Sequence, residues 1–190
     1  MLSDLSGAGG AGSWAVGNDF KGHARTGAVA WVYNNKAYVV TGLGINSVQT
    51  TDFYSFDPTQ PLGTRWNSSL RPIGGVTDQS YDAGYTIERG YGVAWAGINQ
   101  GVYKGYLTWG QNGGNLTSTW EYDYITDLWS IKTPFPMGLG RVGGVAVSIN
   151  DTGYLGLGGT TFNGGGTYFS DWTKFYPSLT YNPDDYTGNQ

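Results

Sequence analysis

The chain has 190 residues and a formal net charge of −4; 13% of its residues are charged, 16% are aromatic and 33 are Gly. It has no basic excess and no run of 18 apolar residues, which argues against nucleic-acid binding and a membrane-spanning helix. Cys is absent, which excludes disulfides and thiolate metal sites. Abundant Gly and aromatic residues indicate many short strands joined by tight turns.

Residues 1–12 are polar and Gly-rich, without the basic and apolar regions of a signal peptide. If the protein is exported, its signal is not present in this chain. Residues 13–22 follow and open on Trp14, and their interpretation depends on the units after them.

Three units then repeat one pattern. Each has an Arg, a small residue one or two positions later, an apolar strand, a polar turn, a Tyr and a closing Gly. The units begin at Arg25, Arg89 and Arg141, and their second strands end at Gly42, Gly110 and Gly158-Gly159. Self-similarity at a period of roughly 40–50 residues is typical of propeller blades.

Each unit continues into an aromatic third strand, at residues 51–57, 118–123 and 169–176. Aromatic and polar residues alternate there, which predicts half-buried strands. Fourth strands begin at Trp66 and Trp129, and the segment from Trp14 to Gly22 matches the one from Trp129 to Gly138 in type and order. We therefore predict blades at 25–70, 89–136 and 141–180, the last lacking its own outer strand. Residues 13–22 are interpreted as that outer strand, displaced to the front of one domain spanning 1–190.

The distance from Trp66 to Arg89 is longer than the corresponding distance in the next unit. We predict an insertion of about a dozen residues near positions 74–88, on a loop between blades, where long loops are often functional.

The Arg-small opening, the Gly pair, the aromatic third strand and the Trp on the fourth strand together resemble the kelch repeat. The resemblance runs from Trp14 to Tyr176. Gly158-Gly159 matches the double glycine fully, whereas the sites at Gly42 and Gly110 keep part of it. It implies an all-β, kelch-type β-propeller with four-stranded antiparallel blades, of the kind found in bacterial exported or cell-surface proteins. The implied location is extracellular or on the cell surface, and the periplasm also fits.

Propellers typically have four to eight blades, whereas three are counted here. The chain is part of a longer propeller, or two copies pair as a homodimer that completes the ring, or the N-terminus and the insertion supply a fourth blade. We favour a fragment or a dimer, because three twisted sheets would leave wide gaps in a closed ring.

The recurring Arg25, Arg89 and Arg141 suggest either a basic ring that attracts an anion or a structural tie between blades through backbone carbonyls. We expect the structural role. The same role is expected for the other repeat positions, Gly158, Gly159, Trp14, Trp66 and Trp129.

No catalytic residue, metal site or cofactor is predicted. The kelch resemblance extends to galactose-oxidase-like enzymes, but one His and no Cys exclude their copper site. Asp57, Asp123 and Asp171 would suit paired-carboxylate glycoside chemistry. Asp57 precedes Pro58 at a strand end, which favours a turn-capping role instead.

The loops after the second strands are polar and rich in Gly and Asn. They provide the candidate binding residues Asn46, Gln49, Gln111, Asn112, Asn115, Phe162, Asn163 and Tyr168. We predict a non-enzymatic binding or scaffold module that recognises a protein or a glycan through these loops. The alternatives are a glycan-active enzyme or a fragment of one (sialic acid mutarotase-like or a hydrolase), or an assembly subunit of a surface complex. Clustered carboxylates at an open channel would favour the enzyme.

Overall fold

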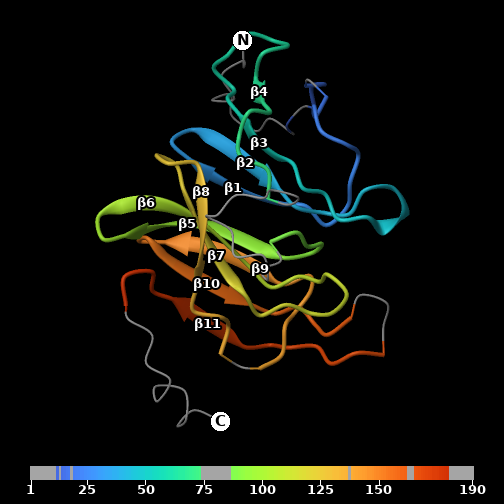
Figure 1. Cartoon of the computed structure of the whole chain (residues 1–190), viewed down its shortest axis with the longest axis vertical. Coiled ribbons are helices and arrows are strands. Elements are labelled where there is room, and N and C mark those ends of the chain that lie inside the picture. Colours follow the sequence, from blue (N-terminus) through green and yellow to red (C-terminus); the bar gives the residue numbers. More distant parts are fainter. Residues whose placement is uncertain are drawn as a thin grey trace.

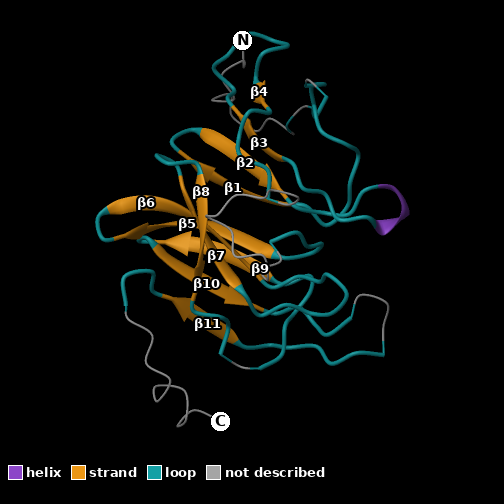
Figure 2. Ribbon diagram, in the orientation of Figure 1, coloured by secondary structure: helices purple, strands orange, loops and turns teal. Residues whose placement is uncertain are grey.

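The computed structural model describes residues 12, 14–17, 19–73, 87–136, 138–161 and 165–179. In this part of the chain, strands dominate and the helical structure is the 3-10 turn η1 (Ile45–Ser47). The strands form three separate antiparallel sheets (Figure 2). The prediction of an all-β protein with about three antiparallel, propeller-type blades is confirmed.

The three sheets follow one another along the chain. Sheet 1 contains β1 (Val29–Tyr33), β2 (Lys36–Val40), β3 (Phe53–Phe56) and β4 (Trp66–Asn67). Sheet 2 contains β5 (Val93–Asn99), β6 (Val102–Thr108), β7 (Thr119–Asp123) and β8 (Leu128–Lys132). Sheet 3 contains β9 (Val145–Ile149), β10 (Thr152–Gly156) and β11 (Trp172–Phe175), in the order β11-β10-β9.

Tight turns join the first two strands of each sheet. Asn34 and Asn35 have φ angles of 48° and 58°, and Asn150 and Asp151 have 47° and 62°. Two successive positive φ angles match the twist of paired strands, and Asn and Asp tolerate them best. The polar turns seen in the sequence are therefore the hairpin turns of sheets 1 and 3.

The sheets are stacked in chain order, with the first strands β1, β5 and β9 next to one another (Figure 1). One buried cluster, which includes Trp31, Phe53 and Trp129, fills the space between sheets 1 and 2. A second, which includes Trp95, Tyr106 and Leu155, fills the space between sheets 2 and 3. Large aromatic residues thus hold each sheet against the next.

A Gly at the end of each second strand brings neighbouring sheets together. Gly42 and Gly110 have φ angles of 110° and 90°. The N–H of Gly42 donates to the Arg89 carbonyl at 2.8 Å, and that of Gly110 donates to the Arg141 carbonyl at 2.6 Å. The repeated Gly therefore ties each sheet to the one after it.

The described residues form an open stack and not a closed ring. Trp14 is fully exposed, and residues 14–17 and 19–22 lie outside the strands. Phe20 instead packs on Tyr54 and Trp66 of sheet 1, with ring centroids 4.9 Å apart in both pairs. Sheet 2 separates this segment from β11, so the outer strand predicted at 13–22 does not complete sheet 3 within the same chain. Residues 74–86 of the predicted insertion lie outside the described residues.

Candidate functional site

The connections between the second and third strands emerge at one end of the three sheets (Figure 1). We call residues 44–50, 111–117, 159–161 and 165–168 the loop face. Each connection is held by two isolated β-bridges. In the first, Leu43 bridges Thr26 and Gln49, and the bridges of Gln111 and Gly159 repeat this arrangement. The repeat therefore presents three loops from equivalent positions.

The amide side chains of the loop face have different roles. Asn115 Nδ2 donates to the Thr160 carbonyl at 2.9 Å, which joins the second loop to the third. Asn112 Nδ2 donates to the Glu88 carbonyl at 3.1 Å. Asn46 lies exposed in η1 with a φ of 59°. The structure thus assigns Asn112 and Asn115 to holding the loops, and it leaves Asn46 facing solvent.

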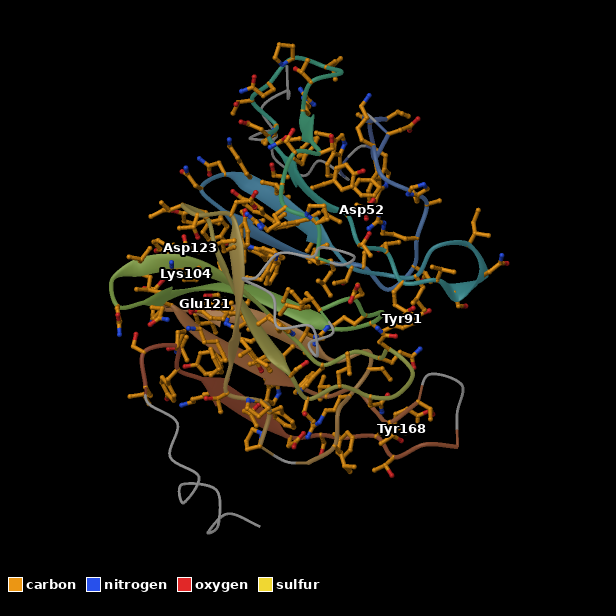
Figure 3. All side chains as sticks on the ribbon, in the orientation of Figure 1. Asp52, Tyr91, Lys104, Glu121, Asp123 and Tyr168 are labelled. Carbon is orange, nitrogen blue, oxygen red and sulfur yellow. The ribbon has the colours of Figure 1, made fainter. Side chains whose placement is uncertain are left out.

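The remaining candidates lie at the surface of the same face. Gln49 and Gln111 are half-buried at the bridge positions, and Tyr168 is 64% exposed (Figure 3). Phe162 and Asn163 lie outside the described residues.

A pocket lies beside Tyr168, at the sheet 3 end of the loop face. It is lined by Val142, Gly143, Gly158, Gly159, Thr161, Tyr168 and Phe169. The sequence pointed to both glycines and to Tyr168, but it gave no sign that they share a pocket with Val142 and Phe169. Val142 precedes the first strand of sheet 3, and Phe169 precedes its third strand, so these residues become neighbours only when the chain folds.

The repeated Arg side chains lie beneath the loop face. Arg141 donates to the Leu157 carbonyl at 3.3 Å and to both carboxylate oxygens of Asp171, at 2.5 and 2.6 Å. Its guanidinium also lies 4.1 Å from the ring centroid of Phe169. Arg25 makes the corresponding bonds to the Thr41 carbonyl and to Asp52.

Arg89 is the middle member of this series and is fully buried. It donates to the Trp109 carbonyl at 2.9 Å and to Ser118, which occupies the carboxylate position of the other units. Burial lowers the pKa of Arg89 to about 9, and the charge of Glu88 opposes this shift. The guanidinium therefore remains protonated at pH 7. Each of the three side chains joins the second and third strands of its own sheet, and none projects as an anion-binding group.

The three candidate carboxylates are all engaged. Hydrogen bonds from Thr59 lower the pKa of Asp57 to about 2. The Arg141 hydrogen bond lowers the pKa of Asp171. Burial raises the pKa of Asp123, but hydrogen bonds from Lys104 and two backbone N–H groups outweigh it, so that the pKa is lowered. A general acid needs a raised pKa, so these groups are poorly suited to that role.

A polar network that the sequence did not reveal lies between sheets 2 and 3 (Figure 3). Glu121 is almost fully buried and accepts hydrogen bonds from Tyr106 and Asn99, both at 2.7 Å. Lys132 lies 3.0 Å from the other carboxylate oxygen. The only sequence signal is the Glu121-Tyr-Asp123 alternation, which puts two acids on one strand face. Both carboxylate oxygens of Glu121 have partners, and the network lies away from the loop face.

Across the described residues, no three His, Asp or Glu side chains gather as a metal site would require. No helix among these described residues is long and apolar enough to cross a membrane.

Comparison with known proteins supports the fold. No family model matches the sequence, and no curated protein matches it. Among solved structures, that of YjhT is similar, with a TM-score of 0.59 and 18% sequence identity. The alignment covers 85% of this chain and 44% of YjhT, so the chain spans less than half of the length of that protein. The similarity supports a β-propeller-like all-β fold.

Proposed function

We propose that this chain is a kelch-type propeller module that binds a neutral glycan through its loop face, without catalysing a reaction. The observation that carries the proposal is the composition of that face. Residues 44–50, 111–117, 159–161 and 165–168 include no Asp, Glu, Lys, Arg or His, but they contain the exposed Asn46, the half-buried Gln49 and Gln111, and the exposed ring of Tyr168.

These groups match the chemistry of a sugar. A side-chain amide both donates and accepts hydrogen bonds, as two neighbouring sugar hydroxyls require. An exposed Tyr ring offers an apolar surface to the C–H face of a pyranose and a hydroxyl at its edge. An acidic sugar would need a cation on this face, whereas Arg25, Arg89 and Arg141 bind protein groups below it. A neutral sugar is therefore favoured over a sialic acid.

The lowered carboxylate pKa values favour binding over the alternative of a sialic acid mutarotase-like enzyme or a hydrolase. Asp171 is held by Arg141, and Asp123 by Lys104 at 2.6 Å. An extracellular or cell-surface location fits a glycan ligand and belongs to the same proposal.

The test is a glycan array that contains neutral and sialylated oligosaccharides, probed with the wild-type chain and with Tyr168→Ala. We expect binding to neutral glycans, and we expect Tyr168→Ala to weaken it about tenfold, the size of one aromatic contact. Tyr103→Ala is the matched control, because Tyr103 is 42% exposed and lies near the hairpin end of β6. An array without neutral ligands, or equal affinities for the wild type and Tyr168→Ala, contradicts the proposal. Retention of a protein partner on this face in place of any glycan also contradicts it.

A further inference from the structure

We propose that two copies of the chain close into one ring, in which sheet 3 of each copy packs on sheet 1 of the other. The N-terminal segment at residues 13–22 of each copy then supplies the missing fourth strand of its neighbour's sheet 3. This inference concerns the open ends of the sheet stack and does not depend on the proposed glycan binding.

The first observation is an apolar face that lacks a cover in the described chain. The strand registers align Val145 and Val147 of β9 with Val29 and Trp31 of β1, and with the same positions of β5. In β1 these two residues are 8% and 5% exposed, because sheet 2 covers them. In β9 they are 41% and 46% exposed. Sheet 3 thus presents the surface that its two predecessors bury against a following sheet.

The second observation is complementary side-chain size at this junction. Trp31 fills the space left by Gly105, where an added Cβ would come within 2.7 Å of the indole. Trp95 lies against Gly153 in the same way. At the open junction the smaller Val147 replaces the Trp, and the register places Ala37 at the position of the Gly. The smaller Val147 would thus face a residue that has a Cβ, so the two changes compensate in direction and leave room for sheet 1 of a second copy on sheet 3.

The pocket beside Tyr168 is the third observation. In sheet 1 the corresponding position, beside Leu43, is filled by the next unit: a Cβ on Gly90 would lie 2.7 Å from the Leu43 side chain. In sheet 2 it is filled by Gly140, which lies against the backbone of Leu116. Residues 24–27 hold the equivalent place in the repeat, so those of a second copy would fill the pocket. The Gly158 N–H would then donate to an Arg25 carbonyl, as Gly42 and Gly110 donate to theirs.

The fourth observation links residues 13–22 to the sheet before their own. Arg141 lies 5.0 Å from the ring of Phe135, which follows β8 of the preceding sheet. Arg25 lies 5.0 Å from the ring of Phe20 in the same way. Phe20 therefore repeats the role of Phe135, and Trp14, six residues earlier, repeats that of Trp129. In a two-copy ring, the preceding sheet is sheet 3 of the other copy, whose edge strand β11 has one described neighbour.

The closure has twofold symmetry, because the same pair of surfaces meets at both junctions. Such an interface closes on itself and ends growth at two chains. Pairing of residues 13–22 with β11 also removes an exposed strand edge.

The test is the mass of the 190-residue chain in solution, measured by sedimentation equilibrium across a range of concentrations. We expect twice the 20.4 kDa of one chain. We expect Val147→Asp to raise the dissociation constant at least tenfold, because it buries an unpaired charge at the junction. The matched control is Ile125→Asp, which adds the same charge at an 81% exposed position in the β7–β8 turn and leaves the mass at two chains.

Val32→Asp provides a second variant on the opposite junction surface. Val32 is 67% exposed in this chain, so the substitution leaves each chain folded, which circular dichroism verifies. A mass of one chain at high concentration overturns the proposal, and so does a mass above two chains. Equal dissociation constants for the wild type, Val147→Asp and Val32→Asp also overturn it. Glycan binding by a monomer would retain the proposed function and reject this closure.

Discussion

At the scale of single residues, Gly at the end of each second strand lets the backbone pass close to the segment that enters the first strand of the same unit. Gly110 has a φ of 90°, and an added Cβ would lie 2.7 Å from the Gly90 carbonyl oxygen. Gly101, in the β5–β6 turn, has a φ of 80° but open space around it. Both glycines have a left-handed backbone, but only Gly110 has close neighbours. A comparison of the two positions therefore separates the cost of backbone strain from the cost of a steric clash.

We therefore expect Gly101→Ala to lower the free energy of unfolding by about 1 kcal/mol, the cost of a left-handed Ala. Gly110→Ala should cost about 3 kcal/mol, because the clash adds to the strain. Urea denaturation followed by Trp fluorescence measures both values. Equal losses would show that the backbone at Gly110 does not lie as close to Gly90 as described.

The Arg141–Asp171 pair predicts an acid-dependent part of the stability. Arg141 lowers the pKa of Asp171 in the folded state, so the carboxylate stabilises the fold above its unfolded pKa of about 3.9, and this contribution is lost as the pH falls through the lowered folded value. Asp171→Asn should cost about 1 kcal/mol at pH 7, because partial exposure screens the pair. The two unfolding curves should converge at strongly acidic pH, below the lowered folded-state pKa of Asp171. A difference of the same size at both pH values would mean that the charge is not responsible.

The sequence identified the repeated residues better than their partners. The repeated Trp129 is buried in the core, as its structural role requires, whereas its partners Trp31 and Phe53 come from another unit. The loop position of Asn115 was clear, but its bond to Thr160 joins residues of two units. Such contacts depend on how one sheet sits on the next, which a single unit of the repeat does not encode.

At the scale of elements, period-two alternation located the third strands. However, β3 and β11 contain four residues each and are shorter than predicted, and β3 and β7 are buried on both faces where half-buried strands were expected. The β4 strand contains two residues, too few to show a period. Residues 13–22 show the limit most clearly. Their match to residues 129–138 predicted an outer strand, whereas within one chain Trp14 is exposed and Phe20 packs on sheet 1. In the proposed ring, this strand pairs with β11 of a second copy, so it cannot form in an isolated chain.

The Trp residues of these two segments should respond differently to truncation. Trp129→Ala should lower the free energy of unfolding of each chain by about 3–5 kcal/mol, because the side chain is 2% exposed in the core. Trp14→Ala should leave the unfolding of a dilute chain unchanged and weaken association of two copies. Thermal unfolding at low concentration and sedimentation equilibrium together measure both effects. If Trp14→Ala lowered the free energy of unfolding of the dilute chain, Trp14 would have its packing partner within the same chain.

At the scale of the whole molecule, fold class and repeat order follow from the sequence, but closure does not. Exposure of Val145 and Val147 appears only when the sheets are stacked and the last face is left open. The pocket near Tyr168 appears for the same reason, since its walls come from two strand regions of one unfinished junction. Both features follow if sheet 3 of one copy meets sheet 1 of another.

The most direct measurement of that claim is a disulfide across the junction. The chain has no Cys, so Val147→Cys combined with Ala37→Cys introduces the only pair, and the whole of sheet 2 separates the two positions within one chain. On mild oxidation we predict a single disulfide-linked product at twice 20.4 kDa, which reduction returns to the mass of one chain. The control, Ile125→Cys with Ala37→Cys, should stay at the mass of one chain under the same oxidation. A doubly substituted chain that remains at 20.4 kDa, or that forms a ladder of longer products, would contradict the account.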